Sequence, residues 1–352
     1  MKRFLALLIA LCFLAGCVRV LTPTPTPDLV ATQVVVMEAA AATLTVRAPA
    51  ATATATAAPS PLPTALPSST PTTARLSPTI GPTSLPKAPP LPTPTQPPPT
   101  LGPSLGQFAV VGVYSDDVLN VRAGPGVDRP IVGTIPYAGR DVEVYAGEQQ
   151  VGEARWVPVR YGQVSGWTNG GYLVRQVGQV SDAIAAAAAQ AILALRDDDL
   201  QQLAGLVHPV KGVTFSPYAY VRPLQGAPGE ADLVFSPAQL VSLQNDPTVY
   251  HWGVLDGSGE PIDLTFRQYY DRFVYDVDFA QPDVIGFNQT IGQGNSLNNI
   301  PAVYPNAVTV EYHFTGFDPQ YGGMDWRSLR LVLEEMDGVW YVVGIVHDQW
   351  TI

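Results

Sequence analysis

Histidine is the side chain best suited to acid–base chemistry near neutral pH, and this chain has four. They are His208, His251, His313 and His347. No two have the i, i+4 spacing that puts two metal ligands on one helix face, so we expect no metal site. Because His313 and His347 both lie in the terminal strands, either could pair with Asp325 or Asp348. That pair would make the protein an enzyme. We favour the alternative, in which these polar groups are hydrogen-bonded at the ends of a sheet.

One of the possible His–carboxylate pairs is excluded by its positions in the sequence. His347 and Asp348 are adjacent on an expected strand, so their side chains point to opposite faces and cannot pair directly. The candidates for catalysis are therefore His313, His347 and Asp325, in a site of the hydrolase or isomerase type.

Two glycine-rich loops carry groups that could bind ions. Residues 256–260, Asp-Gly-Ser-Gly-Glu, alternate oxygen ligands with glycine, but they lack the spacing and final Glu of an EF-hand. Residues 292–295, Gly-Gln-Gly-Asn, lack the lysine of a phosphate loop. We interpret the first as a turn and the second as a surface loop, and we expect no cofactor.

Cys17 has a position that indicates covalent modification. It follows Leu14-Ala15-Gly16, and before these comes an apolar run that starts after Lys2 and Arg3. A positive start, an apolar stretch of roughly 7–15 residues and small residues before the cut define a secretory signal. The segment resembles the bacterial lipoprotein lipobox. The resemblance implies cleavage after residue 16 and a diacylglycerol anchor on Cys17, which places the protein outside the cytoplasm and on a membrane.

Other interpretations of the N-terminus remain. An ordinary signal peptide with an incidental cysteine is one. A transmembrane helix fits less well, because spanning needs about 20 apolar residues and Arg19 interrupts the run. Cleavage would also remove Cys12, and the single remaining cysteine could not form an internal disulfide.

Residues 17–105 predict a disordered stalk. Pro, Thr, Ala and Ser dominate this segment and aromatic residues are absent, so burial cannot offset the entropy of ordering the chain. Repeated Thr-Pro steps favour extended, semi-rigid conformations. The whole chain carries a net charge of −11, and its acidic residues concentrate beyond the stalk. This charge argues against nucleic acid and anionic lipid headgroups as the main partners.

Residues 106–177 contain short β-rich runs separated by Gly, Pro or Asp. One run, residues 119–126, reads Leu-Asn-Val-Arg-Ala-Gly-Pro-Gly, and it is followed by Val132-Gly133, Trp156-Val-Pro-Val159, Gly166-Trp167 and Tyr172-Leu173. This pattern resembles the bacterial Src-homology-3 (SH3) domain. In that strand we expect Leu119 and Val121 to face the interior.

The SH3 resemblance implies a small all-β barrel that binds peptidoglycan, through its peptide or its glycan, in a shallow groove. Aromatic rings offer rigid contact area to such ligands, so Tyr114, Trp167 and Tyr172 are the binding candidates. We place Trp156 in the core. A purely structural role for the Asn-Val-Arg-x-Gly-Pro stretch is the alternative.

Residues 181–352 predict a second, α+β domain. Helices are expected at 183–196, capped by Asp182, and at about 199–207. Capping boxes at Ser236 and Thr265 predict two more helix starts. The second of these helices carries an aromatic stripe that we assign to the core: Phe266, Tyr269, Tyr270 and Phe273.

The C-terminal residues predict an antiparallel meander. Residues 308–314 and 329–334 alternate in polarity, and Asp337-Gly338 is a strong two-residue hairpin signal. With that turn, Arg330 should lie opposite Ile345 and Glu334 opposite Tyr341. Helices followed by such a meander resemble the nuclear-transport-factor-2-like cone fold, and the resemblance implies a pocket between sheet and helices.

The expected fold class is therefore multidomain: a disordered stalk, an SH3-like barrel, then an α+β domain with N-terminal helices and a C-terminal antiparallel meander. We interpret the chain as a lipid-anchored cell-envelope protein whose barrel binds peptidoglycan and whose last domain binds an unidentified ligand. An envelope enzyme with a His–carboxylate site and a structural surface spacer are the alternatives. Nucleic acid is not an expected partner.

Overall fold

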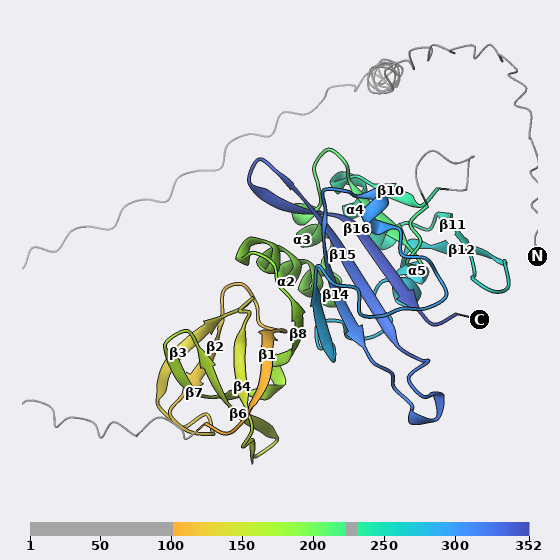
Figure 1. Cartoon of the computed structure of the whole chain (residues 1–352). Coiled ribbons are helices and arrows are strands. Elements are labelled where there is room, and N and C mark those ends of the chain that lie inside the picture. The colour runs from red at the N-terminus through yellow and green to blue at the C-terminus, as the bar shows by residue number, and fades with distance from the viewer. Residues whose placement is uncertain (1–100, 223–230, 352) are drawn as a thin grey trace, which may run out of the picture. The chain divides into compact units, whose positions relative to one another are not determined.

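The computed structural model describes residues 101–222 and 231–351 (Figure 1). The expected signal peptide, Cys17 and the stalk up to residue 100 lie outside the described residues. All described residues belong to one compact unit, Ala88–Ile352. In the part of the chain that is described, no helix is both long and apolar enough to cross a membrane.

A barrel of short strands comes first, closed around its own apolar core. Its elements are β1 (Ser104–Val110), β2 (Val118–Arg122), β3 (Ile131–Pro136), β4 (Val142–Tyr145), β5 (Gln149–Val151), β6 (Ala154–Tyr161), β7 (Val164–Asn169), the 3-10 turn η1 (Gly170–Tyr172) and β8 (Leu173–Gly178). The strands pair in the order β8-β1-β4-β6-β7-β2-β3. As predicted, Leu119 and Val121 are buried in this core.

The first strand lies earlier than the sequence indicates. The barrel was expected to begin at residue 106, but β1 begins at Ser104, inside the segment assigned to the stalk, and ends at Val110. Gly112 has a positive φ of 69°, a conformation that glycine adopts without strain, so the chain turns there and Tyr114 leaves the sheet.

The second part combines short helices with a long twisted sheet. Its helices are α2 (Asp182–Arg196), α3 (Leu200–Leu206), α4 (Pro237–Ser242), α5 (Phe266–Phe273) and α6 (Ile300–Val303), with 3-10 turns η2 (Leu243–Asn245) and η3 (Pro319–Tyr321). Its strands are β9 (Val213–Ser216), β10 (Leu233–Phe235), β11 (Val249–Val254), β12 (Pro261–Thr265), β13 (Val284–Phe287), β14 (Val308–Phe314), β15 (Arg327–Met336) and β16 (Val339–Gln349). The sheet order is β10-β9-β16-β15-β14-β13, and β11 and β12 form a separate hairpin.

The helix starts follow the local sequence signals. Both capping boxes form, at Ser236 before α4 and at Thr265 before α5. Ser181, not Asp182, caps α2, because its hydroxyl accepts from the N–H of Ile184. The aromatic stripe of α5 is buried, as predicted.

The β15–β16 hairpin contains a bulge that shifts its register. Glu334 lies opposite Tyr341 as predicted, but Arg330 lies opposite Val346 instead of Ile345. The pairing slips by one residue around Val343, which is the extra residue that a β-bulge inserts. Because the side-chain period of a strand is two, the slip places Asp348 rather than His347 on the face of the sheet that carries Arg330.

The barrel and the second part share a strand interface and a core. β8 pairs with β1 inside the barrel on one edge and, in parallel, with β13 on the other. Ala109, Val111 and Val174 of the barrel belong to the same buried cluster as the apolar side chains of α2. The observed class is therefore a strand-rich fold with a small barrel and a few helices.

Candidate functional site

A groove of about 390 Å³ opens on the barrel surface. The segment after β1, strand β2 and the turn η1 form its walls. Two aromatic rings stand in it with much of their surface free: Tyr114 is 49% exposed and Tyr172 is 38% exposed. Exposed rings in a concave site provide rigid apolar contact area for a ligand.

Tyr114 is held by two residues at the end of α2. Arg196 donates from Nη2 to the Tyr114 hydroxyl at 2.6 Å, and that hydroxyl donates to Asp197 Oδ2 at 3.1 Å. The Arg196 guanidinium carbon also lies 5.0 Å from the centre of the Tyr114 ring. Hydrogen bonding from Arg196 lowers the pKa of Asp197, so this carboxylate stays charged. A side-chain network therefore fixes the orientation of one groove wall.

Tyr172 is placed by the turn η1. The Asn169 side chain caps the turn by accepting from the N–H of Gly171 at 3.0 Å, and Arg155 donates to the carbonyl of Gly170 at 3.0 Å. Both contacts fix the backbone immediately before Tyr172. The second ring is thus held by backbone geometry rather than by its hydroxyl.

The polar lining of the groove carries both signs of charge. Asp117 and Arg122 line it together with the amide side chains of Asn120 and Asn169. Arg122 is oriented by donating to the carbonyl of Arg129 at 2.8 Å. A ligand with both donors and acceptors, such as a peptide or an acylated sugar, matches this lining.

The comparisons with known proteins bear on this barrel. Residues 117–174 match the family model of the bacterial SH3 domain. These residues form a bacterial SH3 domain. Among curated proteins and among solved structures, none matches this chain.

The groove of the SH3 domain contains two of the three expected aromatic residues. Tyr114 and Tyr172 line it, but Trp167 does not. Trp156 is buried as expected, with 3% of its surface exposed, but it also lines the groove. Strand alternation could have indicated this: Val157 and Val159 fill the barrel core, so Trp156 belongs to the other face of β6.

The expected catalytic residues each have a separate partner. Nδ1 of His313 lies 2.9 Å from Oγ of Ser328, and the Asp325 carboxylate accepts from the N–H groups of Phe317 and Asp318. Nε2 of His347 lies 3.2 Å from Oδ1 of Asp276, a residue in an irregular loop for which the sequence offered no signal. The structure does not join these candidates into one catalytic arrangement. Within the described ranges, no group of three or more His, Cys, Asp or Glu is placed to hold a metal ion.

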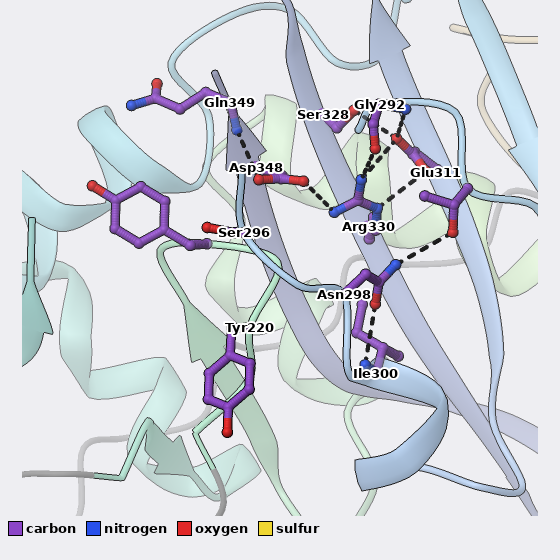
Figure 2. Close-up of polar contacts among 12 residues, drawn as sticks. Tyr220, Gly292, Ser296, Asn298, Ile300, Glu311, Ser328, Arg330, Asp348 and Gln349 are labelled. Atoms are coloured by element: carbon purple, nitrogen blue, oxygen red, sulfur yellow. Dashed lines mark hydrogen bonds and ion pairs between the residues drawn. The ribbon is translucent and has the colours of Figure 1, made fainter. Parts of the chain in front are cut away.

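A buried charged cluster lies on the face of the sheet that carries Arg330 (Figure 2). Arg330 donates to Glu311 at 3.1 Å, to Asp348 at 2.8 Å and to the carbonyl of Gly292 at 2.7 Å. Ser328 donates to Glu311 at 2.6 Å. All four charged or hydroxyl side chains are essentially inaccessible to water. The hydrogen bonds satisfy the charges, as burial requires.

The same cluster fixes the glycine-rich loop, which is not simply a surface loop as expected. Glu311 accepts from the N–H groups of Ile291 and Gly292 at 3.0 and 2.8 Å. Gly292 is buried, and a Cβ there would lie 2.5 Å from Oγ of Ser328. Glycine is required because the loop backbone must approach the sheet this closely.

We expect His313 to make the stability of the protein fall in mild acid. Burial lowers the pKa of His313, with Arg330 acting in the same direction and Glu311 opposing it. Since the unfolded value is about 6.5, the unfolded chain binds more protons below that pH, and the free energy of unfolding decreases as the pH falls through it.

The test compares urea unfolding at about pH 7.5 and about pH 5.5 for the wild type and for His313→Gln. The variant should lose part of the acid destabilisation. An identical pH dependence in both proteins would contradict the assignment.

Proposed function

We propose that the protein is a cell-envelope lipoprotein that binds peptidoglycan through the groove of its SH3 domain. The observation that carries the proposal is the pair of exposed tyrosines, Tyr114 and Tyr172, held rigidly in a groove that also presents Asp117 and Arg122. The match to the bacterial SH3 domain family points to the cell wall as the location of the ligand. Peptidoglycan peptides carry carboxylates and amines, which suit the mixed charge.

The membrane anchor in this proposal rests on the sequence around Cys17. A lipid on that residue and the Pro- and Thr-rich segment after it would hold the SH3 domain away from the bilayer, within reach of the wall.

We further propose that residues 181–352 form a ligand-binding domain of the nuclear-transport-factor-2-like kind. The support is the order of its elements, in which α2 and α3 precede the β14–β15–β16 meander. The separate partners of His313, His347 and Asp325 give the enzyme alternative little support.

Removing both groove tyrosines is expected to abolish most wall binding. The double variant Tyr114→Ala, Tyr172→Ala should lower the affinity for insoluble peptidoglycan about 30-fold or more, because buried aromatic anchors contribute about 2 kcal/mol or more to an interface. The measurement is sedimentation of the purified full-length chain with peptidoglycan at moderate salt.

A matched control comes from Tyr321, which is equally exposed, at 49%, but lies in η3. Tyr321→Ala should sediment like the wild type. If the wild type stays in solution, the wall-binding proposal is overturned, and the SH3 domain becomes a spacer or protein-contact module. Sedimentation of the double variant would place the wall contact elsewhere.

A further inference from the structure

A second hollow, of about 400 Å³, lies in the C-terminal part of the chain. It opens between the segment that follows β9 and the β11–β12 hairpin. Its apolar walls are Tyr218, Tyr220, Val254 and Leu255. The volume falls within the range of small-molecule sites, about 300–1,000 Å³.

Tyr220 presents an aromatic ring from a fixed backbone. Tyr220 is 47% exposed. Before Tyr220 in the chain, buried Ser216 donates to the carbonyl of Tyr218 at 2.9 Å. After Tyr220, the Asn299 side-chain amide accepts from the N–H of Val221 and donates to the carbonyl of Val221, each at 2.8 Å. The backbone that carries Tyr220 is therefore rigid before any ligand binds, which reduces the entropy lost on binding.

Arg222 stands at the rim of the hollow as a paired, immobilised cation. Its Nε donates to Oδ1 of the buried Asp232 at 2.8 Å. The guanidinium lies flat on Gly253, where a Cβ would come within 2.5 Å of Nη1. Because Asp232 neutralises Arg222, the rim offers hydrogen bonds without an excess of positive charge.

Asp256 supplies the acceptors of the rim. Its N–H donates to the Tyr218 hydroxyl at 3.3 Å, and its carboxylate accepts from Ser296 at 3.4 Å and from Thr351. The carboxylate is thus oriented by hydroxyl groups, the same kind of donor that a sugar carries. Asp256 itself is exposed to solvent.

The buried charged cluster helps to place this rim. Arg330 and Glu311 hold Gly292, and the segment that begins there carries Ser296 into the lining of the hollow (Figure 2). Asn295, beside Ser296, donates to the carbonyl of Thr351 at 2.5 Å. The charges buried in the sheet therefore position a surface segment.

We propose that this hollow binds a neutral pyranose saccharide. A pyranose ring has an apolar C–H face, which would stack on Tyr220, and peripheral hydroxyls, which would bond Arg222 and Asp256. Arg222 is neutralised by Asp232, and the exposed Asp256 carboxylate is negatively charged, so the hollow disfavours an anionic ligand. The inference does not depend on the SH3 groove, because the two hollows share no lining residue.

The test is isothermal titration calorimetry of the full-length chain with two neutral probes, tetra-N-acetylchitotetraose and cellotetraose. We expect at least one to bind the wild type, and the comparison shows whether acetamido groups are needed. Tyr220→Ala should weaken binding by about tenfold or more, whereas Tyr220→Phe should retain it, because the ring face supplies the contact.

Two further variants make the result specific. Tyr321→Ala removes an equally exposed tyrosine outside the hollow and should bind like the wild type. Tyr114→Ala removes a wall of the SH3 groove, so saccharide binding that persists in this variant does not depend on that groove. Failure of both probes to bind the wild type overturns the proposal. Loss of binding in Tyr114→Ala with retention in Tyr220→Ala also overturns it, because the saccharide would then occupy the SH3 groove.

Discussion

Arg330→Met is expected to lower the free energy of unfolding by about 3–5 kcal/mol, the usual effect of removing one partner of a buried ion pair. Glu311 and Asp348 would remain in the sheet without a counter-charge, and the carbonyl of Gly292 would lose its donor. The measurement is urea unfolding of the full-length chain, followed by circular dichroism.

The matched control for this substitution is Arg327→Met on the same strand. Arg327 pairs with Asp276, but the pair is partly open to water, so its loss should cost much less. Equal effects of the two substitutions would show that the buried cluster has no special role in stability.

The loss of stability in Arg330→Met should depend on pH. Burial already raises the pKa of Asp348, and the charge of Arg330 opposes that rise. Without Arg330, the folded-state pKa of Asp348 rises further above its unfolded value. The contribution of this carboxyl to the free energy of unfolding is then retained at low pH and lost as the pH rises. The deficit of Arg330→Met relative to the wild type should therefore be smaller at about pH 5 than at about pH 7.

Cys17→Ser is expected to abolish lipid attachment completely. The cysteine sulfur is the nucleophile that would accept the diacylglycerol, and a serine hydroxyl is far less reactive. An attached pair of acyl chains would provide stable anchoring, since each buried CH₂ contributes about 0.8 kcal/mol and one chain alone holds a protein only weakly. The measurement is incorporation of labelled palmitate in an expressing bacterium, together with the mass of the N-terminal peptide.

The second cysteine of the chain supplies the control. Cys12 lies inside the apolar run, so Cys12→Ser should keep both the label and the cut after residue 16. A wild-type protein without label, or one whose label survives in Cys17→Ser, would rule out the lipoprotein assignment.

The barrel was predictable because its signals are local. The Asn-Val-Arg-x-Gly-Pro-Gly turn and the alternation of Leu119 and Val121 specify neighbouring residues, and the structure confirms the burial of both. The groove was only partly predictable. Alternation along β6 separates Trp156 from the core residues Val157 and Val159, but only the packing of β2 and η1 decides that Trp156, and not Trp167, lines the groove.

The second part shows where sequence reasoning fails. Both capping boxes were found because each spans only four residues. The bulge at Val343 left no such signal, and it reverses which of His347 and Asp348 meets Arg330. The ion partners of Arg330 lie on the neighbouring strands β14 and β16, so they follow from the strand register. The partner of His347, Asp276, lies in a loop 71 residues away and follows from tertiary packing alone.

The strand β8 has a consequence for how the chain unfolds. Because β8 is hydrogen-bonded to β1 on one edge and to β13 on the other, and because α2 buries barrel side chains in its own core, neither part can open without exposing apolar surface of the other. Such a unit loses its structure cooperatively. Any ligand that binds only the folded form adds its binding free energy to the whole unit. A wall fragment held in the SH3 groove would therefore also protect the hollow beside Tyr220 against global unfolding and against proteolysis from the unfolded state.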